Sequence, residues 1–471
     1  MKNKSRLIFL IFTISFVLFL MVFMRIDSDY LWHIKAGEYM FSNHSILTHD
    51  IFSWTIPGTY WMSHEWGFEV IIYGLYLLFS KYNIFVYGLV CSLLLFLIIY
   101  FINRENIERN KLFGIIWLCL GFITSTVMLA RPHMLSSIFL LLTCYFCYDL
   151  YNNEDSKKIF FLPIIAILWA NIHGGSSNLV YLIPLIFIIA SVCKFNFSKV
   201  EANRLSLKQI NTYILIMCIS FLCLNINPHG IKMIFYPYEN MLNSTMLATI
   251  SEWQPTVLNN GTHLMYFVLA FIIVLIFTLS KKKIRFIDGI LFLFCLFLGL
   301  NSIRFWIYTY IIMSLVVFYY IPDRKDDKGT NIILILASCL FIFIFGYSFN
   351  KNIMVDTTKT ELSDKFINTI KKENPNKLYN LYNLGGELIY NDIEVFIDGR
   401  ADLYSKKNYN DSLDLTFLSK DFKKIMKKYD FDYYLVSSKY PLYYYLKDNK
   451  SYKLIYKEKE YYFYKKIKKE V

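Results

Sequence analysis

Long apolar runs separated by short polar segments dominate the chain. A helix needs about 20 apolar residues to cross a bilayer, and shorter runs cross only with tilt or with buried ends. The pattern predicts a polytopic α-helical membrane protein with about 11 transmembrane helices, several of them short. The expected spans are 7–24, 84–102, 112–130, 134–150, 159–172, 179–193, 211–225, 263–280, 286–300, 305–321 and 330–348.

Residues 66–80 form a further apolar run that fits either a membrane span or an amphipathic helix on the membrane surface. The charges of the loops favour the surface helix. If 66–80 does not span and the N-terminus is cytoplasmic, most basic loops fall on the cytoplasmic side, as the positive-inside rule requires. All eight histidines then lie on the external face. We expect a C-terminus on the external side.

Composition agrees with this class of protein. Of the 471 residues, 56% are hydrophobic, whereas soluble globular chains have about 45–50%. The formal net charge of +13 comes from short loops and from the last part of the chain, which indicates membrane topology and no nucleic-acid partner. The nine cysteines all fall in apolar runs, so no disulfide framework is expected.

The runs also predict two domains. Residues 1–349 are expected to form the transmembrane domain, with external loops at 25–83 and 226–262. Residues 350–471 are expected to form a small extracytoplasmic α/β domain. Its alternating segments predict strands, and residues 419–428 predict an amphipathic helix. The expected strands are 378–383, 394–400, 432–438, 452–457 and 460–466.

The first external loop gathers many ionisable side chains beside the membrane. Asp29, Trp32, His33 and Gly37 form D-x-x-W-H-x-x-x-G. On a helix, Asp29 and His33 share one face, where the carboxylate can accept a proton from a substrate hydroxyl. The alternative is structural, with the aspartate as a helix cap and the tryptophan as an interface anchor.

A second cluster in the same loop contains two further carboxylates. Asp50, His64 and Glu65 lie in D-x-F-S-x-T-x-x-G-x-x-W-x-x-H-E-W. Ionisable groups next to hydrocarbon cost free energy unless they line a wet cavity or a substrate path. Asp50 and Glu65 are therefore rival catalytic carboxylates to Asp29, and His33 and His64 are substrate-binding candidates. An interfacial loop held by aromatic anchors is the structural alternative.

Later loops on the same predicted face supply further candidates for substrate binding. Arginine suits a phosphate group, although an arginine at a helix end can also extend to the headgroups. A histidine followed by two glycines suits close approach of a ligand, or a helix C-cap. These candidates are Arg131, His133, His173, Glu252 and Arg304.

Known cofactor motifs are missing from the sequence. It has no zinc-protease, lipase-type, Walker or dinucleotide-binding signature. Carboxylates and histidines can hold Mg²⁺ or Mn²⁺, but no spacing here requires a metal.

The motifs and architecture resemble those of known membrane proteins. The chain is similar to an uncharacterised bacterial family of multispan proteins that carry both loop motifs and later R-P-H, W-A-N-x-H-G-G, N-P-x-G, E-W and D-G-R-A-D elements. More broadly it resembles the GT-C glycosyltransferases, which use polyprenyl-phosphate-linked sugars at the outer leaflet. This resemblance implies Asp29 as the catalytic base and a bacterial plasma-membrane location.

The sequence therefore predicts an inverting membrane glycosyltransferase. Its expected partners are a polyprenyl-phosphate sugar, membrane lipid, and an envelope glycan, lipid or protein acceptor. The alternatives are a flippase or transporter of lipid-linked glycans, a glycan polymerase or ligase, and an interaction scaffold. Few charges fall inside the apolar runs, which argues against transport. The longest loop comes early in the chain, which argues against the polymerase.

Overall fold

The computed structural model describes residues 2–23, 29–126, 131–192, 194–241, 253–324, 328–349 and 361–467. The chain forms two compact units. The first combines Met1–Arg25 with Tyr82–Thr357, and the second combines Ile26–Lys81 with Thr358–Val471. The first loop therefore belongs to the same unit as the C-terminal segment. The domain boundary expected at 349/350 adjoins residues 350–360, which lie outside the described residues.

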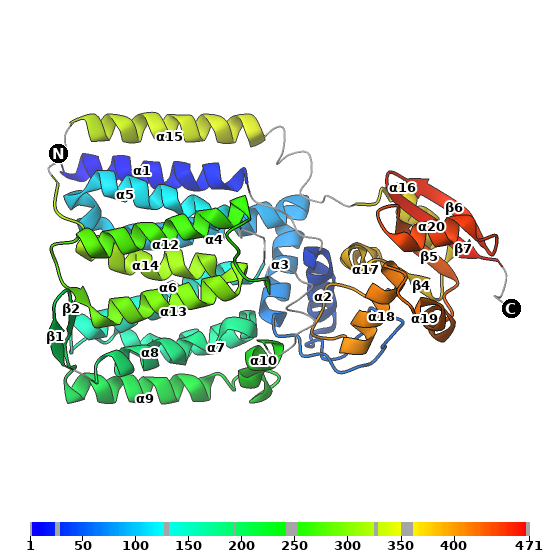
Figure 1. Cartoon of the computed structure of the whole chain (residues 1–471), viewed down its shortest axis with the longest axis horizontal. Coiled ribbons are helices and arrows are strands. Elements are labelled where there is room, and N and C mark those ends of the chain that lie inside the picture. The colour runs from blue at the N-terminus through cyan, green and yellow to red at the C-terminus, as the bar shows by residue number, and fades with distance from the viewer. Residues whose placement is uncertain are drawn as a thin grey trace. The chain divides into compact units, whose positions relative to one another are not determined.

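The first unit is a bundle of apolar helices that run side by side (Figure 1). Each of the eleven expected spans overlaps one of these helices. A small sheet with strand order β1-β2-β3 joins three loop segments, Phe195–Phe197, Val200–Ala202 and Ile284–Arg285. The helices are α1 (Lys2–Met21), α4 (Asn83–Arg109), α5 (Lys111–Leu120), α6 (His133–Asn152), α7 (Leu162–Ile172), α8 (Leu179–Ala190), α9 (Leu207–Cys223), α12 (Gly261–Leu279), α13 (Phe286–Asn301), α14 (Trp306–Tyr320) and α15 (Lys328–Ser348), with the short α10 (Lys232–Met241) after α9.

Six helical segments of the described residues are long and apolar enough to cross a bilayer. Five further apolar helices are only 10–17 residues long. Together they make the chain a multi-pass membrane protein. The six segments are Asn3–Met21, Trp66–Arg109, His133–Asn152, Gly261–Leu279, Ile303–Tyr320 and Gly329–Ser348.

The ambiguous run 66–80 forms a helix, α3 (Trp66–Phe79). It ends at Ser80, whose φ of 49° interrupts regular helical geometry, and the short 3₁₀ turn η1 (Ser80–Tyr82) follows before α4 begins. The boundary between the two units falls at this turn. A surface position for α3 stays a prediction.

The second unit combines helices with a four-stranded mixed sheet. Its strand order is β4-β5-β7-β6, with β4 parallel to β5 and the other pairs antiparallel. The strands are β4 (Leu378–Tyr379), β5 (Tyr433–Ser437), β6 (Tyr452–Glu458) and β7 (Tyr461–Lys466). The helices are α2 (Asp29–Asn43), α3, α16 (Asp364–Glu373), α17 (Gly385–Tyr390), α18 (Lys406–Thr416), α19 (Phe422–Tyr429) and α20 (Pro441–Asp448).

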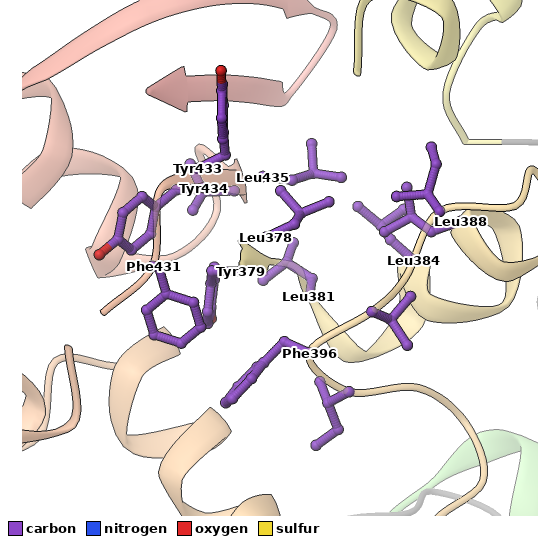
Figure 2. Close-up of a cluster of buried hydrophobic side chains, with 14 of the residues drawn as sticks. Leu378, Tyr379, Leu381, Leu384, Leu388, Phe396, Phe431, Tyr433, Tyr434 and Leu435 are labelled. Carbon is purple, nitrogen blue, oxygen red and sulfur yellow. The ribbon is translucent and has the colours of Figure 1, made fainter. Parts of the chain in front are cut away.

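Aromatic side chains form the core beside the central strand of this sheet. All five residues of β5 are buried, and Figure 2 shows Phe396 and Phe431 packed with Tyr379 and Tyr434. The ring centroids of Phe396 and Phe431 are 5.0 Å apart in an edge-to-face arrangement, which suits aromatic quadrupoles. The turn at 398–402 follows directly after Phe396 and Ile397, which belong to this core.

The strand predicted at 394–400 is wrong. Within it, Val395 forms one isolated parallel bridge with Ser53 of the first loop. The side chain of Asn380 forms hydrogen bonds with the backbone groups that follow. Its amide oxygen accepts from Phe396 N at 2.7 Å, and its amide nitrogen donates to Ile397 O at 2.7 Å. A side chain thus replaces a neighbouring strand.

Candidate functional site

Close packing of α2 on α3 brings the two loop motifs together. A Cβ on Gly37 would lie 2.2 Å from the backbone oxygen of Glu69, so only glycine permits this approach. One turn earlier on α2, His33 is buried, and its Nδ1 lies 3.4 Å from Glu69 Oε1. Gly37 therefore sets the distance between His33 and α3.

A chain of alternating histidines and carboxylates extends from this contact. The Nε2 atom of His33 lies 3.5 Å from Glu65 Oε2, and the other oxygen of Glu65 lies 3.1 Å from His64 Nε2. On its other side, His64 Nδ1 lies 3.5 Å from Asp402 Oδ2. Residues from α2, from the segment before α3 and from the C-terminal segment thus share one cluster.

The cluster holds His64 in its cationic form at neutral pH. Burial by itself lowers the pKa of His64, but the charge of Glu65 and the hydrogen bond with Asp402 outweigh it and raise the pKa to about 10. A protonated imidazole between two carboxylates is a charge-assisted arrangement. His64 therefore brings a fixed positive charge to this acidic site.

Asp29 lies at the start of α2, directly over the C-terminal turn at 398–402. A Cβ on Gly399 would lie 1.9 Å from Asp29 Oδ1 and 2.6 Å from its Cγ. The Asp29 carboxylate therefore occupies the space that a side chain at position 399 would fill. Asp29 itself is half-buried.

The same turn contains a buried arginine that joins it to the first loop. Arg400 is 1% exposed, and its guanidinium lies 2.7 Å from an oxygen of Asp50 and 2.7 Å from an oxygen of Asp398. It also lies 5.0 Å from the ring centroid of Trp61. Buried charges of this kind are tolerated when they are paired and hydrogen-bonded.

Asp50 is fully engaged in this structural arrangement. One of its oxygens pairs with Arg400, and the other accepts hydrogen bonds from Ser53 N at 3.1 Å and from Ser53 Oγ at 2.6 Å. It is 2% exposed. The motif from Asp50 to Trp66 thus supplies two carboxylates: Asp50 pairs with Arg400, and Glu65 contacts the two histidines.

Further hydrogen bonds fix the first loop on the C-terminal segment. The indole of Trp54 donates to Leu378 O at 3.1 Å, and the hydroxyl of Thr55 donates to Phe396 O at 2.7 Å. Backbone bonds join Trp54 N to Val395 O and Val395 N to Phe52 O, both at 3.1 Å. These contacts hold the loop in one conformation and so position its ionisable side chains.

The remaining candidates belong to the first unit. His173 is buried, and its Nδ1 lies 2.6 Å from Ser136 Oγ, which also accepts from the indole of Trp169 at 2.8 Å. Arg131 and His133 are half-buried at the start of α6. Glu252 lies outside the described residues.

Arg304 is half-buried in the first unit, just before α14. Its guanidinium carbon lies 4.5 Å from the ring centroid of Trp253. Within the described residues, no carboxylate lies within 4.0 Å of its guanidinium nitrogens. An arginine that stacks on an aromatic ring and keeps its donors available suits phosphate recognition.

The part of the chain that the structure describes contains no complete ligand set for a divalent cation. No group of three or more His, Cys, Asp or Glu side chains there is arranged to hold a metal ion. Glu65 instead contacts His33 and His64, and Asp50 pairs with Arg400. A Mg²⁺ or Mn²⁺ ion therefore stays a prediction.

Sequence reasoning missed Glu69, which is fully buried and accepts a hydrogen bond from Ser63 Oγ at 3.0 Å. A signal was present, because Glu69 is the one charged residue in the apolar run Trp66–Phe79. Ionisable groups in such runs usually have a specific partner. Asp402 carried only a weaker signal, as part of D-G-R-A-D.

Comparison with known proteins finds similarity in structure alone. No protein-family model and no curated protein matches the chain. Among solved structures, it is similar to the Archaeoglobus fulgidus oligosaccharyltransferase tethered with an acceptor peptide containing the NVT sequon, with a TM-score of 0.53 and 12% identity. That match covers 87% of this chain and 65% of the archaeal chain.

Two more structures from this archaeon give the same picture. The oligosaccharyltransferase in the apo form matches with a TM-score of 0.50 and 12% identity, over 87% of this chain and 66% of that one. The oligosaccharyltransferase AglB in complex with an inhibitory peptide and a dolichol-phosphate matches with a TM-score of 0.50 and 11% identity, over 87% and 65%. The chain thus spans slightly less than two thirds of their length.

The similarity confirms the resemblance predicted from the sequence at the level of fold. The archaeal oligosaccharyltransferase is a GT-C glycosyltransferase, and the chain shares its arrangement over most of its own length. Identity of 12% carries no information on substrates, because one fold hosts many functions.

Proposed function

We propose that the chain is an inverting membrane glycosyltransferase. It takes a glycosyl group from a polyprenyl-phosphate-linked donor and transfers it to an acceptor hydroxyl at the outer leaflet. The observation that carries this proposal is the fixed carboxylate of Asp29, half-buried at the start of α2 and held over Gly399. The GT-C fold and the paired histidines and carboxylates around Glu65 support it.

The proposed reaction is a single displacement at the anomeric carbon. The acceptor oxygen attacks that carbon as Asp29 takes its proton. A new carbon–oxygen bond forms, and the bond between the anomeric carbon and the phosphate oxygen breaks on the opposite face. The phosphate leaves with the bonding electron pair. Glu65 is the alternative base, and its contacts with His33 and His64 suit it to positioning these two imidazoles.

Basic groups stabilise the leaving phosphate in this proposal. The guanidinium of Arg304 lies beside Trp253 and pairs with no carboxylate of the described residues, and Arg131 and His133 lie at the start of α6. Donors that are fixed before the reaction stabilise developing negative charge without reorganisation. His173 bonds Ser136 inside the first unit and is assigned to the support of this region.

The proposed acceptor is an envelope glycan, a lipid or a protein. The archaeal relative was solved with an acceptor peptide and with a dolichol-phosphate, which supports a lipid-linked donor and leaves the acceptor class broad. The proposed location is the bacterial plasma membrane. The N-terminus is cytoplasmic in this proposal, and the C-terminal segment is extracytoplasmic.

Mass spectrometry of cell-envelope glycans and polyprenyl-linked lipids tests the function. A deletion strain is compared with the same strain that expresses the wild-type chain or Arg304→Gln at equal membrane levels. We expect the deletion to lose one glycan and to accumulate its lipid-linked donor, and Arg304→Gln to reduce transfer strongly. Unchanged glycans and lipids in the deletion would contradict the proposal. A donor that accumulates only in the inner leaflet would indicate a flippase.

A further inference from the structure

A cavity in the first unit lies apart from every residue assigned above. It has a volume of about 410 Å³ and opens where the last turns of α4, α6 and α14 meet the segment before α13. Small-molecule sites commonly have volumes of about 300–1,000 Å³. The cavity therefore has the size of a headgroup or a small ester.

The walls of this cavity are unusually polar for a bundle of apolar helices. Asparagines, tyrosines and charged residues outnumber the aliphatic side chains that line it. Polar groups at the ends of membrane helices cost free energy unless they have partners or contact a ligand. The lining includes Asn106, Tyr145, Tyr319, Arg109, Lys282 and Arg285.

Three cations border the cavity and keep hydrogen-bond donors to spare. Lys282 donates to Tyr319 O at 2.6 Å and lies 4.0 Å from the same ring, which leaves two of its three N–H groups. Arg109 bonds the side chain of Asn106. Arg285 uses Nε and Nη2 on Asp288, so its Nη1 remains. Each of the three cations thus has N–H groups that bond no acceptor of the described residues.

The carboxylates near the cavity do not take up all of those donors. Asp288 is fully buried and accepts from Arg285, Tyr148 and Tyr320. Asp149 also lines the cavity, where one of its oxygens pairs with Lys158 at 3.0 Å and the other accepts from the hydroxyl of Ser156. Asp323 is largely exposed, and its oxygen lies 3.9 Å from Arg109 Nη1, beyond hydrogen-bond distance.

From this imbalance we propose that the cavity binds a phosphate group. A phosphate offers several acceptor oxygens and negative charge to donors that come from three segments, and arginine forks match its geometry. Basic pockets between transmembrane helices bind anionic headgroups by this chemistry. The phosphate belongs either to a membrane phospholipid or to a soluble ester. This site takes no part in the glycosyl transfer proposed above.

Ligand-induced thermal stabilisation of the purified full-length chain in detergent tests the site. The probes are dioctanoyl phosphatidylglycerol and glycerol 3-phosphate, with dioctanoylglycerol as the uncharged control. The variants are Lys282→Gln and Arg109→Gln, singly and together. Lys281→Gln is the matched control, because Lys281 precedes Lys282 and does not line the cavity.

We expect at least one phosphate probe to raise the unfolding temperature, and dioctanoylglycerol to have no effect. Each glutamine variant should raise the apparent Kd about tenfold, which corresponds to about 1.4 kcal/mol, because it removes a charged donor to the phosphate. Lys281→Gln should bind as the wild type does, and Lys282→Arg should retain binding if the glutamine variants prove unstable. Stabilisation by phosphatidylglycerol alone identifies a lipid headgroup, and stabilisation by both probes identifies a general phosphate site.

Two results would overturn the proposal. One is the absence of stabilisation by either phosphate probe. The other is equal stabilisation of the wild type, Lys281→Gln and the Lys282→Gln/Arg109→Gln double variant, because binding would then take place elsewhere on the chain.

Discussion

Alanine at Gly399 tests the contact that positions the proposed base. Its Cβ would lie 1.9 Å from Asp29 Oδ1, whereas an ordinary contact begins at 3.4 Å, so the carboxylate would have to move by about 1.5 Å. Gly399 is not among the glycines with positive φ, which in the described residues are Gly58 and Gly230. The backbone therefore accepts alanine, and the effect is steric. A misplacement of about 1 Å can cost about 100-fold in rate.

We expect Gly399→Ala to lower glycosyl transfer about 100-fold, measured as product per membrane-embedded chain by mass spectrometry. Gly74→Ala is the matched control, because a Cβ there has no heavy atom within 4 Å. The double variant Asp29→Ala/Gly399→Ala separates the contact from general damage. If the two residues touch as described, any loss of thermal stability in Gly399→Ala should largely disappear when the carboxylate is absent. Full activity of Gly399→Ala at normal membrane level would refute the reasoning.

Two further predictions concern the C-terminal turn and its neighbours. Arg400→Met leaves the buried carboxylates of Asp50 and Asp398 without their cation. We expect the free energy of unfolding to fall by about 3–5 kcal/mol, seen as a much lower unfolding temperature. Arg400→Lys should restore little stability, because lysine lacks the planar guanidinium that bonds two carboxylates at once. His64 has its pKa raised from 6.5 to about 10, so its stabilising contribution is complete below pH 6.5 and is lost as the pH rises through 10. His64→Gln should flatten the unfolding temperature of the full chain between pH 6.5 and 10, and an unchanged pH profile would contradict this assignment.

Apolar length made the helices of the first unit predictable. Each expected span corresponds to a helix, because runs such as Gly261–Leu279 and Lys328–Ser348 contain no strong breaker in their interior other than an isolated glycine. A different signal applied to α2, because the i, i+4 spacing of Asp29 and His33 places both residues on one face if the segment is helical, as it is. Five apolar helices have only 10–17 residues. For these helices, length alone does not determine how they cross the bilayer.

The union of the first loop with the C-terminal segment could not be read from local pattern. Thr55 and Phe396 are hydrogen-bonded although they lie 341 positions apart, and no periodicity encodes such a pair. The error at 394–400 has the same origin, because Asn380 and the loop take hydrogen bonds that the pattern assigns to a strand. The motifs indicated Asp29, His33, His64 and Glu65 as candidates, but they did not indicate that a side chain at Gly399 would occupy the space of the Asp29 carboxylate.

The most direct measurement is donor and product analysis in the deletion strain that expresses Asp29→Asn. Glu65→Gln tests the rival carboxylate, and Glu38→Gln is the matched control, because Glu38 lies on the same helix and its side chain is 43% exposed. We predict that Asp29→Asn, at normal membrane level, makes no product and accumulates the lipid-linked donor, while Glu38→Gln restores the glycan. Wild-type product from Asp29→Asn would contradict Asp29 as the base, and a loss confined to Glu65→Gln would move that role to Glu65.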